Sequence, residues 1–170
     1  THLNLGKLFL ITELHASALT ALQHVEALSE KLPLTSRIEA DVHLFRGILE
    51  IQSDREEEGK HALQQAVNIG QAIQFEPVLV VALGWLAKLA ATHGDFAAAD
   101  LWLRDAQGLA ILNHRPLLQM GLDAAVGYVC RLRGDGAGVE AAGKRLRELS
   151  MQYEALRSPE YRQALADLQP

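Results

Sequence analysis

The sequence predicts an all-α protein in which antiparallel helical hairpins stack side by side into a superhelix. Three observations support this fold class. Ala and Leu dominate a 170-residue chain that is 49% hydrophobic but only 5% aromatic, and both residues favour helix over strand. Apolar residues recur at spacings of three and four, as on one face of a helix. Similar segments also return at a spacing of about 40 residues, which is typical of helical-repeat proteins.

The clearest hairpin is predicted over residues 78–112. One apolar stripe on each helix is formed, in order, by Leu79, Leu83, Leu86 and Ala90, and by Phe96, Ala99, Leu103, Ala106 and Ala110. His93, Gly94 and Asp95 separate the two helices. Gly94 can adopt the left-handed conformation that ends a helix, and Asp95 can cap the next one. Such a hairpin cannot bury both of its faces alone, so we expect neighbouring units to cover it.

Four helices are predicted before this hairpin. The first two are expected over residues 3–14 and 16–32. A third follows Pro33, with Thr35 or Ser36 as its N-cap and with Glu39 three residues after Ser36, as in a capping box. A fourth is expected over residues 55–74, after a turn at Ser53 and Asp54. The predicted stripes of the third and fourth helices are Ile38, Val42, Phe45 and Leu49, and then Leu63, Ala66, Val67, Gly70 and Ile73.

Three helices are predicted after the hairpin. The seventh opens at Pro116, and Gly134 with Asp135 forms the turn into the eighth. A short ninth helix, over residues 158–168, is expected to cap the end of the array. The inward residues of the seventh and eighth helices are expected to be Leu118, Leu122, Ala125, Val126 and Val129, and then Val139, Ala142, Leu146, Leu149, Tyr153 and Leu156.

Equivalent positions recur along the chain. Gly47, Ala87 and Gly127 are equally spaced, and Asp95 and Asp135 are separated by the same interval. Asp54 is aligned with these aspartates, although it lies one residue too far from Asp95. Small residues at repeated positions allow paired helices to approach closely. We therefore predict one domain over residues 1–170, with about four hairpins and a C-terminal capping helix.

Composition narrows the function classes. A net charge of −5 and a pI near 5.8 argue against direct nucleic acid contact by this domain, which normally needs an excess of Lys and Arg. No apolar run approaches the roughly 18 to 20 residues of a membrane span. The single cysteine, Cys130, excludes an internal disulfide and suits the reducing cytoplasm. Since the chain opens on Thr1 within an expected helix, we expect it to be part of a larger protein.

The hairpin over residues 83–106 resembles a tetratricopeptide unit. Leu86 and Ala87 stand where that family has a Leu-Gly pair, and Gly94, Asp95, Phe96, Ala99, Leu103 and Ala106 follow its pattern. The period is about 40 residues, in place of the family's 34, and the usual Trp and Tyr of the first helix are missing. Ala-rich arrays of this longer period, with Gly-Asp turns, are similar to the sensor region of MalT-like activators of the LuxR family. This resemblance implies a right-handed superhelix that receives an inducer or an inhibitory protein.

No motif in the sequence predicts catalysis, a metal site or a cofactor. The segment from Gly138 to Lys144 is close to a phosphate-binding loop, but Arg145 stands where Ser or Thr is required. The tripeptide 133–135 spells an adhesion motif, and its repeat at Gly94 and Asp95 indicates a turn instead. The seven histidines form neither an HExxH motif nor a pair four residues apart. Cys130 has no neighbouring base that would activate it.

Two tryptophans, Trp85 and Trp102, are expected to fill gaps between hairpins; an exposed one could instead anchor a ligand. The first helices of successive hairpins line the concave face of a tetratricopeptide-like superhelix. The repeat register therefore places the predicted groove at Asp41, Leu44, Ile48, Gly84, Lys88, Tyr128 and Arg131. Lys88 and Arg131 could bind a carboxylate or an acidic peptide, with Tyr128 as a flat apolar contact, although all three could equally be ordinary solvated side chains.

The sequence thus favours a non-catalytic module that senses a small-molecule inducer or binds a protein, within a multidomain bacterial transcriptional regulator. The alternative is a scaffold or chaperone-type repeat that binds a partner peptide or mediates self-association into a homo-oligomer. An all-helical enzyme is the third and least favoured alternative, because no catalytic set of residues is assembled in the sequence.

Overall fold

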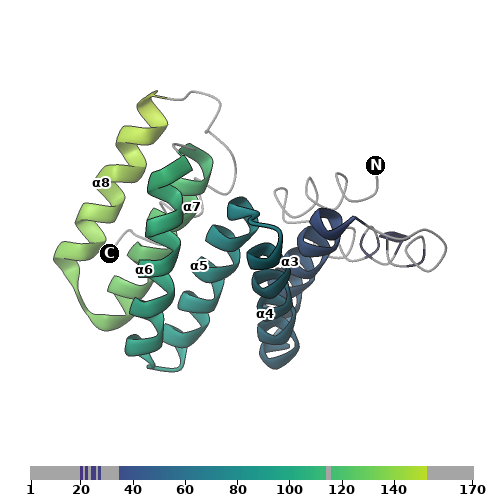
Figure 1. Ribbon diagram of the computed structural model, residues 1–170. Helices are drawn as coiled ribbons and strands as arrows, with labels where there is room; N and C mark the ends of the chain where they lie inside the picture. Colours follow the sequence, from purple (N-terminus) through teal and green to yellow (C-terminus); the bar gives the residue numbers. More distant parts are fainter. Residues whose placement is uncertain are drawn as a thin grey trace. The chain divides into compact units, whose positions relative to one another are not determined.

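The computed structural model describes residues 35–113 and 116–152, together with five helical residues, Thr20, Leu22, His24, Val25 and Ala27. Within these ranges every regular element is a helix, which confirms the all-α prediction (Figure 1). The helices expected over residues 3–14 and 158–168, most of the one over 16–32, and the inward positions Tyr153 and Leu156 lie outside the described residues. The helices are α3 (Ser36–Gln52), α4 (Glu56–Ala72), α5 (Glu76–Thr92), α6 (Phe96–Asn113), α7 (Pro116–Arg133) and α8 (Gly136–Gln152).

These helices follow a strict period. They begin at equal intervals along the chain, at Ser36, Glu56, Glu76, Phe96, Pro116 and Gly136. Two helices with their turns therefore form a repeat of about 40 residues, which confirms the hairpin period predicted from the sequence. The alignment of Asp54 with Asp95 is wrong: Asp54 occupies the position of Gly94, one residue earlier in the turn.

The same turn follows α3, α4, α5 and α7. In each, an amide just beyond the helix donates to a carbonyl five residues earlier, and the residue before that amide has a positive φ, which defines a Schellman motif. These hydrogen bonds, from amide to carbonyl oxygen, join Arg55 to Glu50 (2.9 Å), Phe75 to Gly70 (2.8 Å), Asp95 to Ala90 (2.9 Å) and Asp135 to Cys130 (2.9 Å). The left-handed residues are Asp54 (φ 60°), Gln74 (φ 52°), Gly94 (φ 77°) and Gly134 (φ 79°).

Two of these turns also carry the expected aspartate cap. The Asp95 carboxylate accepts the Ala98 amide at 3.0 Å, and the Asp135 carboxylate accepts the Gly138 amide at 2.9 Å. Each bond satisfies a helix amide that would otherwise lack a partner. At the start of α3 the N-cap is Thr35, one of the two predicted residues, and its side chain makes no capping bond. The capping box between Ser36 and Glu39 does not form, because it requires Ser36 as the N-cap.

The chain divides into two compact units, residues 1–82 and 83–170. In the first unit α3 packs against α4 through a close approach of two glycines. A Cβ on Gly47 would lie only 2.7 Å from Leu63 Cγ and 2.9 Å from the Gly59 carbonyl oxygen. Leu63 is fully buried beside them. The prediction that a small residue at position 47 allows close packing is confirmed.

The second unit holds residues 83–92 of α5 together with α6, α7 and α8. Most of the predicted inward residues are buried: Leu103, Ala106, Leu122, Ala125, Val129, Ala142 and Leu146 are each at most 7% exposed. Arg133, at the end of α7, donates to the Asp100 carboxylate of α6 at 2.6 Å, and its guanidinium lies 5.1 Å from the centre of the Phe96 ring. This pair of contacts joins consecutive hairpins. The superhelical path of the whole array stays a prediction.

Candidate ligand-binding site

Basic and aromatic side chains meet where α5 and α7 lie side by side within the second unit. The Lys88 ammonium on α5 lies 4.5 Å from the centre of the Trp85 ring and 5.9 Å from the centre of the Tyr128 ring on α7. Lys88 and Tyr128 lie equally far from the starts of their helices, so they occupy the same position in consecutive hairpins. We call Trp85, Lys88, Thr92, Tyr128 and Arg131 the α5–α7 cluster.

Hydrogen bonds hold the Tyr128 ring in place. The Thr92 hydroxyl donates to the carbonyl oxygen of Lys88 at 3.0 Å and lies 3.2 Å from the Tyr128 hydroxyl. A threonine hydroxyl has only one hydrogen to donate, so Tyr128 donates to Thr92. The phenol is therefore tied to α5, although it belongs to α7.

A second cation lies against the same phenol ring. The Arg131 guanidinium lies 5.5 Å from the centre of the Tyr128 ring. Each such contact is worth about 0.5–1 kcal/mol at an exposed site. Two positive charges from successive hairpins are thus held in restricted positions, which reduces the ordering cost when they bind a ligand.

The structure brings together three of the residues that the sequence placed in the groove: Lys88, Tyr128 and Arg131. Two members of the cluster were not among the predicted groove residues: Thr92 was missed, and Trp85 was considered as a ligand anchor only if exposed. Trp85 was expected to fill a gap, but it is half-buried and faces the Lys88 ammonium. The signal that could have identified both residues is their helical spacing, three before and four after Lys88.

The groove positions on α3 need correction. Leu44 and Ile48 were expected to project outward, yet they are only 4% and 8% exposed. Ala40, Leu44 and Ile48 follow one another at a spacing of four, so they form a second buried stripe on α3. Neither side chain is available to a ligand.

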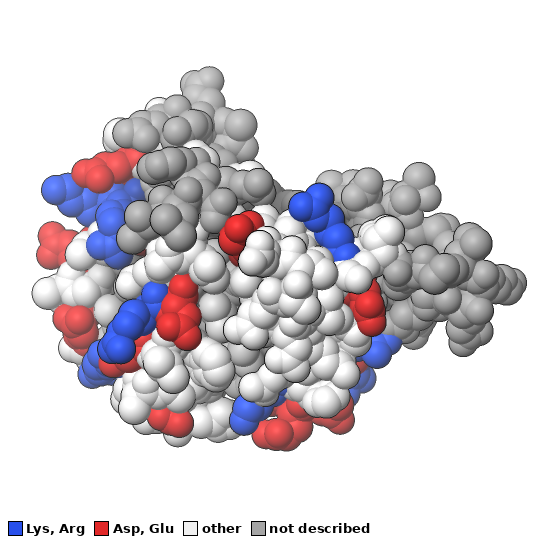
Figure 2. Space-filling model, viewed as in Figure 1, with Lys and Arg blue, Asp and Glu red and all other residues white. Residues whose placement is uncertain are grey.

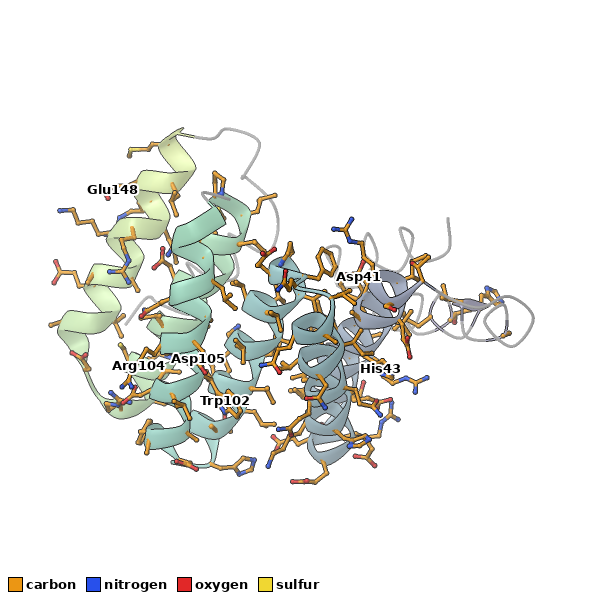
Figure 3. All side chains as sticks on the ribbon, in the orientation of Figure 1. Asp41, His43, Trp102, Arg104, Asp105 and Glu148 are labelled. Atoms are coloured by element: carbon orange, nitrogen blue, oxygen red, sulfur yellow. The ribbon has the colours of Figure 1, made fainter. Side chains whose placement is uncertain are left out.

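Two further positions from the predicted groove are now placed. Asp41 is half-buried and projects from α3, as does His43 (Figure 3). Asp41 belongs to the first unit, whereas the α5–α7 cluster belongs to the second. Gly84 is buried, and a Cβ there would lie 3.6 Å from Ala125 Cβ. Within the second unit, the predicted groove residues with accessible side chains are Lys88, Tyr128 and Arg131.

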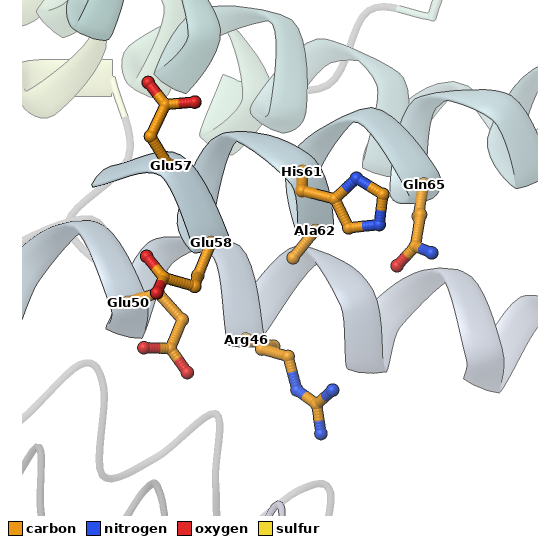
Figure 4. Close-up of a pocket in the computed structure, with 7 residues that line it drawn as sticks. All are labelled: Arg46, Glu50, Glu57, Glu58, His61, Ala62 and Gln65. Atoms are coloured by element: carbon orange, nitrogen blue, oxygen red, sulfur yellow. The ribbon is translucent and has the colours of Figure 1, made fainter. Parts of the chain in front are cut away.

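An open depression of about 540 Å³ lies between α3 and α4 in the first unit (Figure 4). Its lining is acidic on balance and contains Arg46, Glu50, Glu57, Glu58, His61, Ala62 and Gln65. Glu50 already forms an ion pair with Arg55. Among the described residues no group of three His, Cys, Asp or Glu side chains is arranged to hold a metal ion.

One histidine close to this depression is unusual. The Nδ1 atom of His43 is buried and has no hydrogen-bond partner. Burial lowers the pKa of His43 below its ordinary value of 6.5, nearby Glu39 opposes that shift, and His61 adds to it. A neutral imidazole is therefore favoured at this position.

The other segments and residues that the sequence analysis tested for a chemical function have structural roles. Gly138 and Lys144 are inside α8, so the segment whose sequence is similar to a phosphate-binding loop is helical. Gly134 of the adhesion-like tripeptide forms a turn, as expected. The pKa of the Cys130 thiol is raised, mainly by burial and further by Asp135, so the reactive thiolate is disfavoured.

A buried carboxylate in the second unit also has a structural partner. The Asp123 side chain on α7 is 3% exposed and accepts a bond from Arg145 Nε of α8 at 2.7 Å. Gln119 donates to its other oxygen at 3.3 Å. Because both oxygens are paired within the fold, this group holds α7 against α8.

Charge on the molecular surface is mixed. On the face shown in Figure 2, Lys and Arg side chains alternate with Asp and Glu among the described residues. No described helix has the length and apolar content of a membrane span.

Comparison of the sequence with protein-family models and with curated proteins, and of the fold with solved structures, finds no match. A function for this chain therefore has to be inferred from the helices and side chains described above.

Proposed function

We propose that this chain is a non-catalytic helical-repeat module that binds a partner protein through the α5–α7 cluster. The observation that carries this proposal is the convergence of Lys88 and Arg131 on the Tyr128 ring, from two consecutive hairpins. Tyr, Trp and Arg are the residues that contribute most often to binding energy at protein interfaces. The tie from Thr92 to Tyr128 prepares the surface in advance.

A protein partner is favoured over a small inducer because of where the cluster lies. Small-molecule sites are concave and enclose most of their ligand. The cluster is formed by half-buried and exposed side chains on two helices, and none of its residues lines the depression between α3 and α4. A surface of this kind suits a peptide or a protein segment.

The regulatory setting is the finer part of the proposal. It is supported by the resemblance of the hairpin over residues 83–106 to the sensor repeats of MalT-like activators. The equal spacing of the helices and the Gly-Asp turns agree with that resemblance. The module would then receive a signal protein, while other domains carry out ATP hydrolysis and DNA binding.

Selection from a displayed random-peptide library tests the proposal. The intact chain is the bait, and a Tyr128→Ala variant serves for counter-selection. We expect peptides that bind the wild-type chain and lose binding to the variant, whose folding is checked by circular dichroism. If no peptide is enriched, but a metabolite mixture raises the melting temperature of the chain, the protein-binding proposal is wrong and small-molecule sensing is favoured.

A further inference from the structure

An exposed leucine extends the α5–α7 cluster. Leu132 on α7 is 42% exposed. It lies four residues after Tyr128, so the two side chains share one face of α7. The surface formed by the cluster and Leu132 therefore combines two cations, two rings and an aliphatic contact.

The positive charges at this surface stand out against the rest of the chain. The protein carries 21 acidic and 16 basic side chains, with a net charge of −5. At this surface, however, two positively charged groups, the Lys88 ammonium and the Arg131 guanidinium, lie against the same Tyr128 ring. Two cations on one phenol ring also repel each other, and that repulsion is relieved when an anion binds between them.

We propose that this surface binds an acidic segment of the partner protein that also carries an apolar side chain. The inference rests on the proposed function and names the chemistry of the partner. Two carboxylates pair with Lys88 and Arg131, and the apolar side chain contacts Leu132. The Tyr128 ring, which both cations approach, limits where the two carboxylates can bind.

The spacing of the two cations defines the segment further. The charged groups of Lys88 and Arg131 lie 5.9 Å and 5.5 Å from the same ring centre, so they can be separated by at most the sum of these distances. Alternate residues of an extended chain lie on one side and about 7 Å apart. Glutamates at two alternate positions, with a leucine at the next alternate position, therefore present all three side chains to the surface.

A labelled peptide tests this inference directly. The probe is a short fluorescein-labelled peptide with a Glu-Ser-Glu-Ser-Leu core, and its binding to the intact chain is followed by fluorescence anisotropy. Peptides with a Gln-Ser-Gln-Ser-Leu or a Lys-Ser-Lys-Ser-Leu core are expected to bind about tenfold more weakly or worse. Added salt is expected to weaken the binding of the Glu-containing peptide only, because salt screens the attraction between exposed charges.

Single substitutions locate the binding. Lys88→Ala and Arg131→Ala are each expected to weaken binding of the Glu peptide about tenfold. Leu132→Ser is expected to weaken it at every salt concentration, because this substitution removes an apolar contact. Lys144→Ala is the matched control, since Lys144 is an exposed cation on α8 with a side chain 72% exposed. It should leave binding unchanged.

A charge reversal gives the decisive result. The variant with Lys88→Glu and Arg131→Glu is expected to prefer the Lys-containing peptide over the Glu-containing one. An unchanged preference for the acidic peptide would overturn the inference, and so would an equal loss of binding in Lys144→Ala. If the double variant does not fold, the single alanine variants and their control still decide the question.

The peptide selection separates this inference from the proposed function. Selected peptides that depend on Tyr128 but lack acidic residues would refute the acidic partner and leave the binding module intact. A lack of any selected peptide would refute the binding module itself.

Discussion

The α3–α4 and α7–α8 hairpins have the same backbone turn but are held together by different side chains. In α3–α4 the helices approach through Gly47 and Gly59, and the turn places Asp54 in the left-handed region. In α7–α8 a half-buried Val139 stands at the position equivalent to Gly59, an ion pair between Arg145 and the buried Asp123 carboxylate links the helices, and the turn uses Gly134.

This comparison shows that helix length and turn geometry define the repeat more strictly than residue identity does. The Schellman bonds and the equal spacing of helix starts are kept in both hairpins. The means of holding the helices together can change because several packing solutions satisfy the same geometry. Substitutions that weaken the packing between the two helices of a hairpin should therefore cost different amounts of stability in α3–α4 and in α7–α8.

Gly47→Val is expected to be the most damaging, because it forces α3 away from α4. Its Cβ would meet the backbone oxygen of Gly59, which cannot move cheaply. Overpacking of this kind should cost about 3 kcal/mol in the free energy of unfolding, measured by urea titration with circular dichroism. Gly108→Ala is the control, since nothing lies within 4 Å of a Cβ there. It should raise stability by up to about 1 kcal/mol, and an equal loss in both variants would refute the close-approach argument.

Arg145→Ala is the corresponding change in α7–α8, because it leaves the Asp123 carboxylate buried without its charged partner. We expect a loss of about 2 kcal/mol, below the full value for a buried pair because the Arg145 side chain is 45% exposed. Arg133→Ala breaks an ion pair whose side chains are 38% and 50% exposed, and it should cost less than about 1 kcal/mol. If the two substitutions destabilise equally in chemical unfolding, burial of Asp123 is not what makes its pair important.

Substitutions at the left-handed residues of two turns are expected to change stability in opposite directions. Gly134→Ala places a Cβ on a residue with φ of 79° and is expected to cost about 1 kcal/mol. Gln74→Gly relieves the same strain at φ of 52° and is expected to raise stability by up to about 1 kcal/mol. Thermal unfolding monitored by circular dichroism measures both changes. The shared turn geometry would be contradicted if Gln74→Gly destabilised the protein.

For His43 we expect a smaller effect on stability, which depends on pH and is confined to α3–α4. Burial is the main cause of its lowered pKa in the folded protein, so the unfolded chain binds a proton more readily. Stability from this group is fully present above the ordinary pKa of 6.5 and falls as the pH drops below it. Urea midpoints above and below that pH should differ less in His43→Gln than in the wild type. An identical pH dependence in both would show that His43 does not contribute.

Most of the fold could be predicted from the sequence because its turns carry local signals. Gly94 with Asp95, and Gly134 with Asp135, combine a left-handed glycine with a capping aspartate, and both turns form as predicted. The turn at Gln74 could not be found in this way, because glutamine has no special preference for the left-handed region. It becomes visible only once the equal spacing of the helices is known.

The candidate site was predicted in part for a similar reason. The repeat offset places Lys88 and Tyr128 together, and the structure agrees. Burial of Leu44 and Ile48 was missed because α3 carries two apolar stripes, and only one of them was assigned to the core. The exposure of Leu132 also depends on packing between hairpins, which local periodicity does not encode.

Binding of a partner through the α5–α7 surface can be observed residue by residue in amide NMR spectra of the intact labelled chain. Titration with the peptide that has the Glu-Ser-Glu-Ser-Leu core is expected to shift signals around Lys88, Tyr128 and Arg131 in a saturable way. Signals of His61 and Gln65, which line the α3–α4 depression, should stay in place. Saturable shifts at that depression, with none on α5 and α7, would show that the α5–α7 surface is not the binding site.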